Sequence, residues 1–103
     1  MRAIFTILCL LVSSSVFAQS AAHERLKVMQ ANPASLQAAI AAGKKASFFC
    51  ANCHGEGGVA KTSDVPNLAG QHPTYLLEQI RKFGSGERID AFMQGLIKVL
   101  SDD

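Results

Sequence analysis

Two cysteines and a histidine lie close together in the middle of the chain, in the order Cys50, Ala51, Asn52, Cys53, His54. On a helix, residues three and four positions apart share one face, so both thiols and the imidazole would point the same way. Two thiols can add to the two vinyl groups of a haem while an adjacent imidazole binds its iron. The C-x-x-C-H spacing therefore predicts attachment of a c-type haem.

Three other uses of paired cysteines compete with this interpretation. A thioredoxin-like C-x-x-C motif follows an apolar strand, whereas residues 36–49 are rich in Ala and Lys and indicate a helix. A structural zinc ion needs four ligands, and only the distant His23 or His72 could join the two cysteines. A plain disulfide stays open, but it would leave His54 without a role. Haem attachment uses all three residues of the motif.

The first 18 residues have the pattern of a secretory signal peptide. Arg2 precedes an apolar run that is too short to span a membrane comfortably, and Ala18 ends a site that a signal peptidase can cleave. An uncleaved anchor is the alternative, which the short run disfavours. Cleavage after Ala18 would leave 85 of the 103 residues and remove Cys9, which has no predicted role. Haem is attached through thioethers outside the cytoplasm, so export to the periplasm agrees with the motif.

The charge balance of the chain excludes one class of partner. Arg2 is one of ten basic residues, so the mature chain would carry nine against eight acidic residues. This balance is not typical of a nucleic-acid binder. A chain of this length is also marginal for a core made of protein alone, and a covalently held porphyrin would add apolar bulk.

Local signals predict helices on both sides of the motif and no strands. Asn32 and Pro33 are a capping residue and a first-turn proline, which start a helix that we expect to reach the cysteines. Residues 55–70 are rich in Gly, Ser, Asn, Asp and Pro and indicate an irregular loop. A second helix is expected from Pro73 to about Phe83, closed by glycines at 84 and 86. Leu76, Ile80 and Phe83 form its apolar stripe.

A third helix is predicted to begin at Asp90 and to carry Met93, with Leu96, Ile97 and Leu100 also facing inward. A methionine in such a helix is more often a core residue than a ligand. Haem iron attached upstream would need a ligand on its second face, however, and this makes Met93 the expected one. His72 is the alternative, although a histidine at a helix start is more often solvated or a cap.

The chain resembles the short bacterial class I c-type cytochromes, which are small periplasmic electron carriers. The resemblance runs from about Gly43 to Asp103. The residues that carry it are, in order, Cys50 to Gly55, Pro66 to Gln71, Tyr75, Leu76, Gln79, Phe83, Gly86, Arg88, Met93 and Leu100 to Asp102.

The resemblance implies a small all-α fold, similar to cytochrome c, around one covalent haem c. Cys50 and Cys53 would form the thioethers, and His54 and Met93 would be the axial ligands. The Pro66 carbonyl would accept a hydrogen bond from the other ring nitrogen of His54. Two further contacts with the haem are expected, from Leu68 on a porphyrin face and from Arg88 near a propionate.

In this interpretation residues 1–18 are the signal peptide, residues 19–32 a lead-in and residues 33–103 the haem domain. The chain departs from the family pattern in two ways. Ser101, Asp102 and Asp103 have the character of a helix start, but the closing helix of the family does not follow, so we expect either that the polypeptide is truncated or that the domain has lost this helix. Ser47 stands where the family tends to have an aromatic residue.

The expected function is one-electron transfer between membrane-bound or periplasmic redox complexes, without enzymatic chemistry and without a membrane span after signal cleavage. His/Met ligation is among the haem arrangements that raise the reduction potential. One alternative is a haem subunit docked on a larger periplasmic oxidoreductase. Another is a sensor or peroxidase with five-coordinate iron, which would apply if Met93 were not a ligand.

Overall fold

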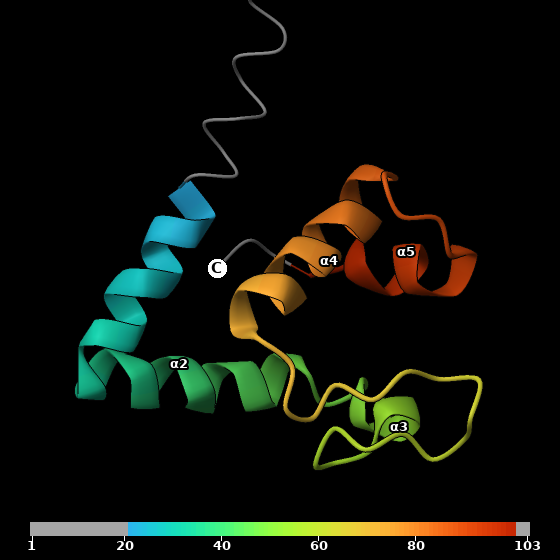
Figure 1. The fold of residues 1–103 in the computed structure, drawn as a ribbon, viewed down its shortest axis with the longest axis horizontal. Helices are drawn as coiled ribbons and strands as arrows, with labels where there is room; N and C mark the ends of the chain where they lie inside the picture. The colour runs from blue at the N-terminus through green and yellow to red at the C-terminus, as the bar shows by residue number, and fades with distance from the viewer. Residues whose placement is uncertain (1–20, 101–103) are drawn as a thin grey trace, which may run out of the picture. The chain divides into compact units, whose positions relative to one another are not determined.

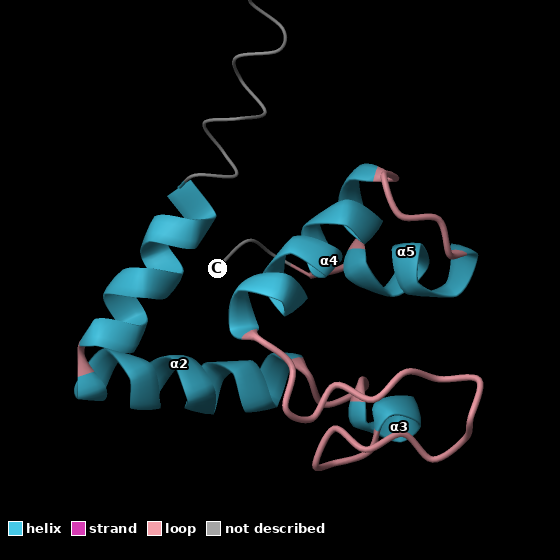
Figure 2. Ribbon diagram, in the orientation of Figure 1, coloured by secondary structure: helices cyan, strands magenta, loops and turns pink. Residues whose placement is uncertain are grey.

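The computed structural model describes residues 21–100, and the regular secondary structure in this range is helical (Figures 1 and 2). The helices are residues 21–31, α2 (Pro33–Ala46), α3 (Ala51–His54), α4 (Pro73–Ser85) and α5 (Ala91–Ile97). The all-α prediction is therefore confirmed for this range. The predicted signal peptide and the helix-start signal at residues 101–103 lie outside the described residues. No helix within residues 21–100 has the length and apolar character that a bilayer span requires.

The chain divides into two compact units between Ile40 and Ala41, inside α2, and each unit is considered by itself. In the first unit, Asn32 caps the start of α2. Its Oδ1 accepts a hydrogen bond from the Ser35 amide at 3.0 Å, and its carbonyl accepts one from the Leu36 amide at 2.9 Å. The predicted helix start at Asn32 and Pro33 is thus confirmed, because the cap satisfies amides that have no partner within the helix.

The second unit contains the end of α2 and shows where the sequence prediction was too simple. We expected one helix up to the cysteines, but α2 ends at Ala46 and residues 47–50 form a turn before α3. In the turn the Cys50 amide bonds to the Ser47 carbonyl at 2.9 Å, a tighter i to i+3 pattern. The Phe48 and Phe49 rings there pack edge to face, with centroids 5.3 Å apart. Serine and phenylalanine have weaker helix propensity than the alanines before them.

Helices α4 and α5 pack against each other in the second unit, as Figure 1 shows. Phe83 near the end of α4 is only 8% exposed. A Cβ on Gly84 would lie 3.5 Å from Ile97 Cγ2, so the two helices are close at this point. Gly86 ends α4 with a left-handed φ of 79°, and its amide bonds to the Phe83 carbonyl at 3.3 Å. The cap is therefore Gly86, whereas Gly84 is inside the helix.

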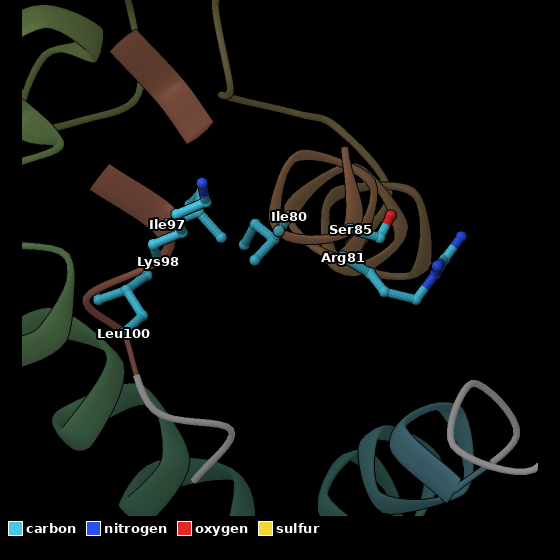
Figure 3. A pocket seen from close by; sticks show the side chains of 7 residues that line it. Ile80, Arg81, Ser85, Ile97, Lys98 and Leu100 are labelled. Atoms are coloured by element: carbon cyan, nitrogen blue, oxygen red, sulfur yellow. The ribbon is translucent and has the colours of Figure 1, made fainter. Parts of the chain in front are cut away.

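A hollow remains between the C-terminal ends of these two helices (Figure 3). Ile80, Arg81 and Ser85 lie on its α4 side, and Ile97 and Leu100 lie on its other side. Ile80 is 44% exposed and Leu100 is 41% exposed. In the predicted stripe of α4, Phe83 is therefore buried and Ile80 is exposed, and Leu100, which was expected to face inward, is exposed as well.

The residues that follow α4 are held to it by charged groups that the sequence did not single out. Arg81 forms ion pairs with Glu78 and Glu87, both at 2.8 Å. The hydrogen bonds from Arg81 lower the pKa of Glu87 below its ordinary value. The guanidinium of Arg88 lies 4.7 Å from the centroid of the Phe83 ring and donates to Gln79 Oε1 at 3.0 Å. These contacts fix the turn that leads into α5.

Asp90 begins α5 as predicted and makes a reciprocal cap. Its Oδ1 accepts a hydrogen bond from the Met93 amide at 2.8 Å, and its own amide donates to Gln94 Oε1 at 3.2 Å. Because α5 has only seven residues, its stability depends strongly on this cap.

Asp90→Ala is expected to lower the free energy of unfolding of the mature protein by about 1 kcal/mol, the usual contribution of such a cap. Asp90→Asn keeps an acceptor oxygen and should lose much less. Chemical denaturation of both variants measures the difference. Equal stability of Asp90→Ala and the unmutated protein would contradict the capping role.

Candidate functional site

The three motif residues are presented by the short helix α3. Cys50 precedes the helix with helical backbone angles, and the amides of Cys53 and His54 both bond to its carbonyl, at 3.3 and 2.9 Å. Both thiols are free, Cys50 half-buried and Cys53 exposed, while His54 is only 9% exposed. Within residues 21–100, no three His, Cys, Asp or Glu side chains gather as a metal ion would need.

The imidazole of His54 is held by a residue twelve positions away. His54 Nδ1 lies 2.8 Å from the carbonyl oxygen of Pro66. A carbonyl can only accept, so Nδ1 must carry a proton, and in the neutral ring this leaves the lone pair of Nε2 free. This is the tautomer that a histidine uses to bind a metal through Nε2. The contact is the one that the family resemblance implies.

The loop between His54 and Pro66 is closed by backbone hydrogen bonds. The Gly58 carbonyl accepts from the amides of Leu68 and Ala69, at 2.7 and 2.9 Å. The Lys61 amide donates to the Cys53 carbonyl at 3.2 Å and so ties the loop to α3. These hydrogen bonds fold the loop back toward α3 and so hold Pro66 beside this helix.

Gly58 occupies a position that only glycine fits. Its φ is +79°, and an added Cβ would lie 2.8 Å from the Ala69 amide nitrogen. Because both the backbone angle and the close approach exclude a side chain, the fold of this loop depends on the glycine.

Gly58→Ala should therefore lower the free energy of unfolding by about 2 kcal/mol. The adjacent Gly57 is a matched control, because it has no positive φ and nothing lies within 4 Å of an added Cβ. Gly57→Ala should change the stability by less than about 0.5 kcal/mol. Denaturation curves of the two variants test the contrast, and equal losses would contradict it.

The other candidate residues lie on different segments. Leu68 is half-buried in the loop, two residues after Pro66. Met93 is half-buried on α5, and its amide is bound by the cap at its helix start. Arg88 lies between α4 and α5, where it contacts Phe83. The structure thus brings His54 and Pro66 into contact, whereas Met93 and Arg88 belong to the packed pair of α4 and α5.

The hydrophobic side chains of the second unit are largely uncovered. Among the described residues, Phe83 is the hydrophobic side chain that is buried. The large apolar side chains of this unit that are exposed are Phe48, Phe49, Val59, Tyr75, Ile80, Ile89, Phe92, Val99 and Leu100. Two free thiols, an imidazole with a free Nε2 and this apolar surface fit a covalently held porphyrin, which would bring apolar area of its own.

Two residues that are not among the predicted site residues hold the loop closed. They are Gly58, described above, and Asn67, whose Oδ1 accepts a hydrogen bond from the Ala60 amide at 2.7 Å. Asparagine beside proline in a glycine-rich loop is typical of side chains that bind the backbone. This composition is the signal that could have identified Asn67, although it does not name the amide that it binds.

No protein-family model matches the chain. Similar curated proteins include cytochrome c4 of Pseudomonas aeruginosa, which is 40% identical over 62 residues, 60% of this chain and 31% of that protein. They also include the thiosulfate dehydrogenase electron acceptor of Thiomonas intermedia, 40% identical over 65 residues, 62% of this chain and 30% of that protein. The chain thus covers less than a third of the length of these relatives.

These similarities confirm the resemblance to c-type cytochromes. A similarity of this kind implies a covalent haem c, and Cys50, Cys53 and His54 have the spacing that its attachment requires.

Proposed function

We propose that the chain is a one-electron carrier with a single haem c, joined through Cys50 and Cys53 and bound axially by His54 and Met93. The observation that carries this proposal is the 2.8 Å contact between His54 Nδ1 and the Pro66 carbonyl, next to two free thiols. It leaves Nε2 as the ring nitrogen available to a metal.

Each residue of the site would have a separate task. When bound, the haem supplies a reversible change between ferric and ferrous iron. The thioethers of Cys50 and Cys53 keep it on the chain. Pro66 would fix the ring orientation of His54 and, by accepting a hydrogen bond from Nδ1–H, would make Nε2 a stronger electron donor.

The remaining site residues would control the surroundings of the haem. Met93 supplies a thioether sulfur, which favours the ferrous state and raises the potential. Leu68 contributes apolar surface that excludes water from a porphyrin face. Arg88 provides a positive charge for a propionate. If His54 and Met93 both bound the haem iron, no open position would be left for a substrate, which favours an electron carrier over an enzyme.

The proposed location is the periplasm, after cleavage of the signal peptide behind Ala18. Residues 19–32 would be the lead-in and residues 33–103 the haem domain. Electrons would pass between membrane-bound or periplasmic redox complexes. One relative is named as the electron acceptor of a thiosulfate dehydrogenase, which supports a dehydrogenase as one class of donor.

A second candidate is a haem subunit or domain of a larger periplasmic oxidoreductase. It is favoured by exposed aromatic side chains of the second unit that a partner protein could cover, such as Phe48 at 67% and Phe49 at 68% exposed. Purification from the source cells separates the two candidates. A freely diffusing small haem protein supports the carrier, and a complex of fixed stoichiometry supports the subunit.

A redox titration of the purified mature protein tests the proposed function. We expect the absorption spectrum to change reversibly with one electron for each chain, and we expect peroxide to leave the ferric spectrum unchanged. Rapid reaction with peroxide would instead support a five-coordinate iron and contradict the carrier.

A further inference from the structure

We infer that Asn67 is a positioning residue for His54, acting through the peptide unit between Pro66 and Asn67. This inference rests on the proposed function, because it assigns a role in setting the axial ligand. The key observation is the 2.7 Å hydrogen bond from the Ala60 amide to Asn67 Oδ1. The Asn67 side chain thus joins the segment that follows Pro66 to Ala60 on the other side of the loop.

The geometry of the peptide bond connects the two residues. The carbonyl that accepts from His54 Nδ1 belongs to the planar unit that also contains the Asn67 amide. The pyrrolidine ring restricts φ of Pro66, so the direction of this carbonyl depends mainly on ψ of Pro66 and φ of Asn67. A side-chain bond that anchors Asn67 therefore limits the rotation of the carbonyl.

Backbone bonds hold the next two residues and make this anchor effective. The amides of Leu68 and Ala69 both donate to the Gly58 carbonyl, at 2.7 and 2.9 Å. The segment from Asn67 to Ala69 is thus attached on its far side to Gly58 and Ala60. Without the Asn67 side chain, residue 67, which follows Pro66 directly, would lose its hydrogen bond with the Ala60 amide.

The consequence for His54 is electronic as well as steric. A looser Pro66 carbonyl accepts a weaker hydrogen bond, and Nε2 then donates less electron density to the iron. Ferric iron gains more from that density than ferrous iron does, so the reduction potential should rise. A role limited to folding would lower stability without this change.

Asn67→Ala and Asn67→Asp in the mature haem-loaded protein test the inference. Proton exchange at His54 Nδ1, followed by NMR in the ferrous state, should be at least tenfold faster in Asn67→Ala. The equilibrium constant for transfer of one electron between Asn67→Ala and a fixed redox partner should shift about threefold, toward ferrous haem in the variant. Asn67→Asp keeps an acceptor oxygen and should retain slow exchange. If Asn67→Ala does not mature, Asn67→Ser, which shortens the side chain, takes its place in the same comparison.

Asn32→Ala is the matched control. Asn32 also accepts a backbone amide, from Ser35 at 3.0 Å, but it lies in the other unit. This control should lose stability and leave the exchange at His54 and the potential unchanged. If the unmutated protein carries haem, but Asn67→Ala has the same proton exchange rate at His54 and the same reduction potential, this inference alone is wrong. Unmutated protein without covalent haem would overturn the proposed function and this inference together.

Discussion

Replacing Cys50 and Cys53 together by alanine is expected to abolish covalent haem attachment. Both thiols are free in the structure, and no other cysteine is present in the chain after the predicted cleavage. The variant should lose its haem on extraction with acidified acetone, whereas the unmutated protein should keep it. Each single variant should keep one thioether and stay coloured after extraction.

Loss of the haem should also weaken the fold of this variant. Among the described residues only Phe83 is a buried hydrophobic side chain, so little apolar area is removed from water by the chain itself. Thermal unfolding followed by circular dichroism should be broad and occur at a lower temperature. Cys9→Ala is the matched control: this cysteine lies in the predicted signal peptide, so the variant should yield the same mature product. Haem retained after extraction by the double variant would contradict the thioether assignment.

Replacing Met93 by alanine is expected to remove the sixth ligand and lower the reduction potential. Thioether sulfur stabilises ferrous iron, and axial ligands span a range of roughly 0.8 V in haem proteins. A decrease on the order of 0.1 V is therefore expected for this variant. The weak ferric absorption band at long wavelength, which reports sulfur ligation, should also disappear.

Met29→Ala is the matched control for this experiment. Met29 is the other methionine of the mature chain and lies in the helix of residues 21–31, in the first unit. It should keep both the band and the potential. A Met93→Ala variant with an unchanged band and potential would show that Met93 is a packing residue. His72, at the start of α4, would then be the next residue to replace.

Helix starts were the part of the fold that the sequence predicted best. Asn32 and Asp90 both accept amides of the first helical turn, as their residue types and positions indicate. Such caps depend on three or four neighbouring residues, so local sequence is enough to identify them. The end of α2 was predicted less well, because the tighter turn at residues 47–50 depends on weaker differences in propensity.

The site was predicted in part, and the limit has a physical reason. The spacing of Cys50, Cys53 and His54 is local and follows from helix geometry. The contact between His54 and Pro66 joins residues twelve positions apart and was expected only from the family resemblance. The closing of the loop by Gly58 and Asn67 involves pairings that no spacing rule specifies, so these bonds became visible only in the structure.

The central claim is that a haem is joined to this chain through two thioethers. The most direct test is the intact mass of the mature protein, secreted from a host that matures cytochromes, before and after extraction with acidified acetone. We predict one haem per chain, retained after extraction, and no titratable thiol. A colourless product with the mass of the polypeptide alone and two free thiols would contradict the account.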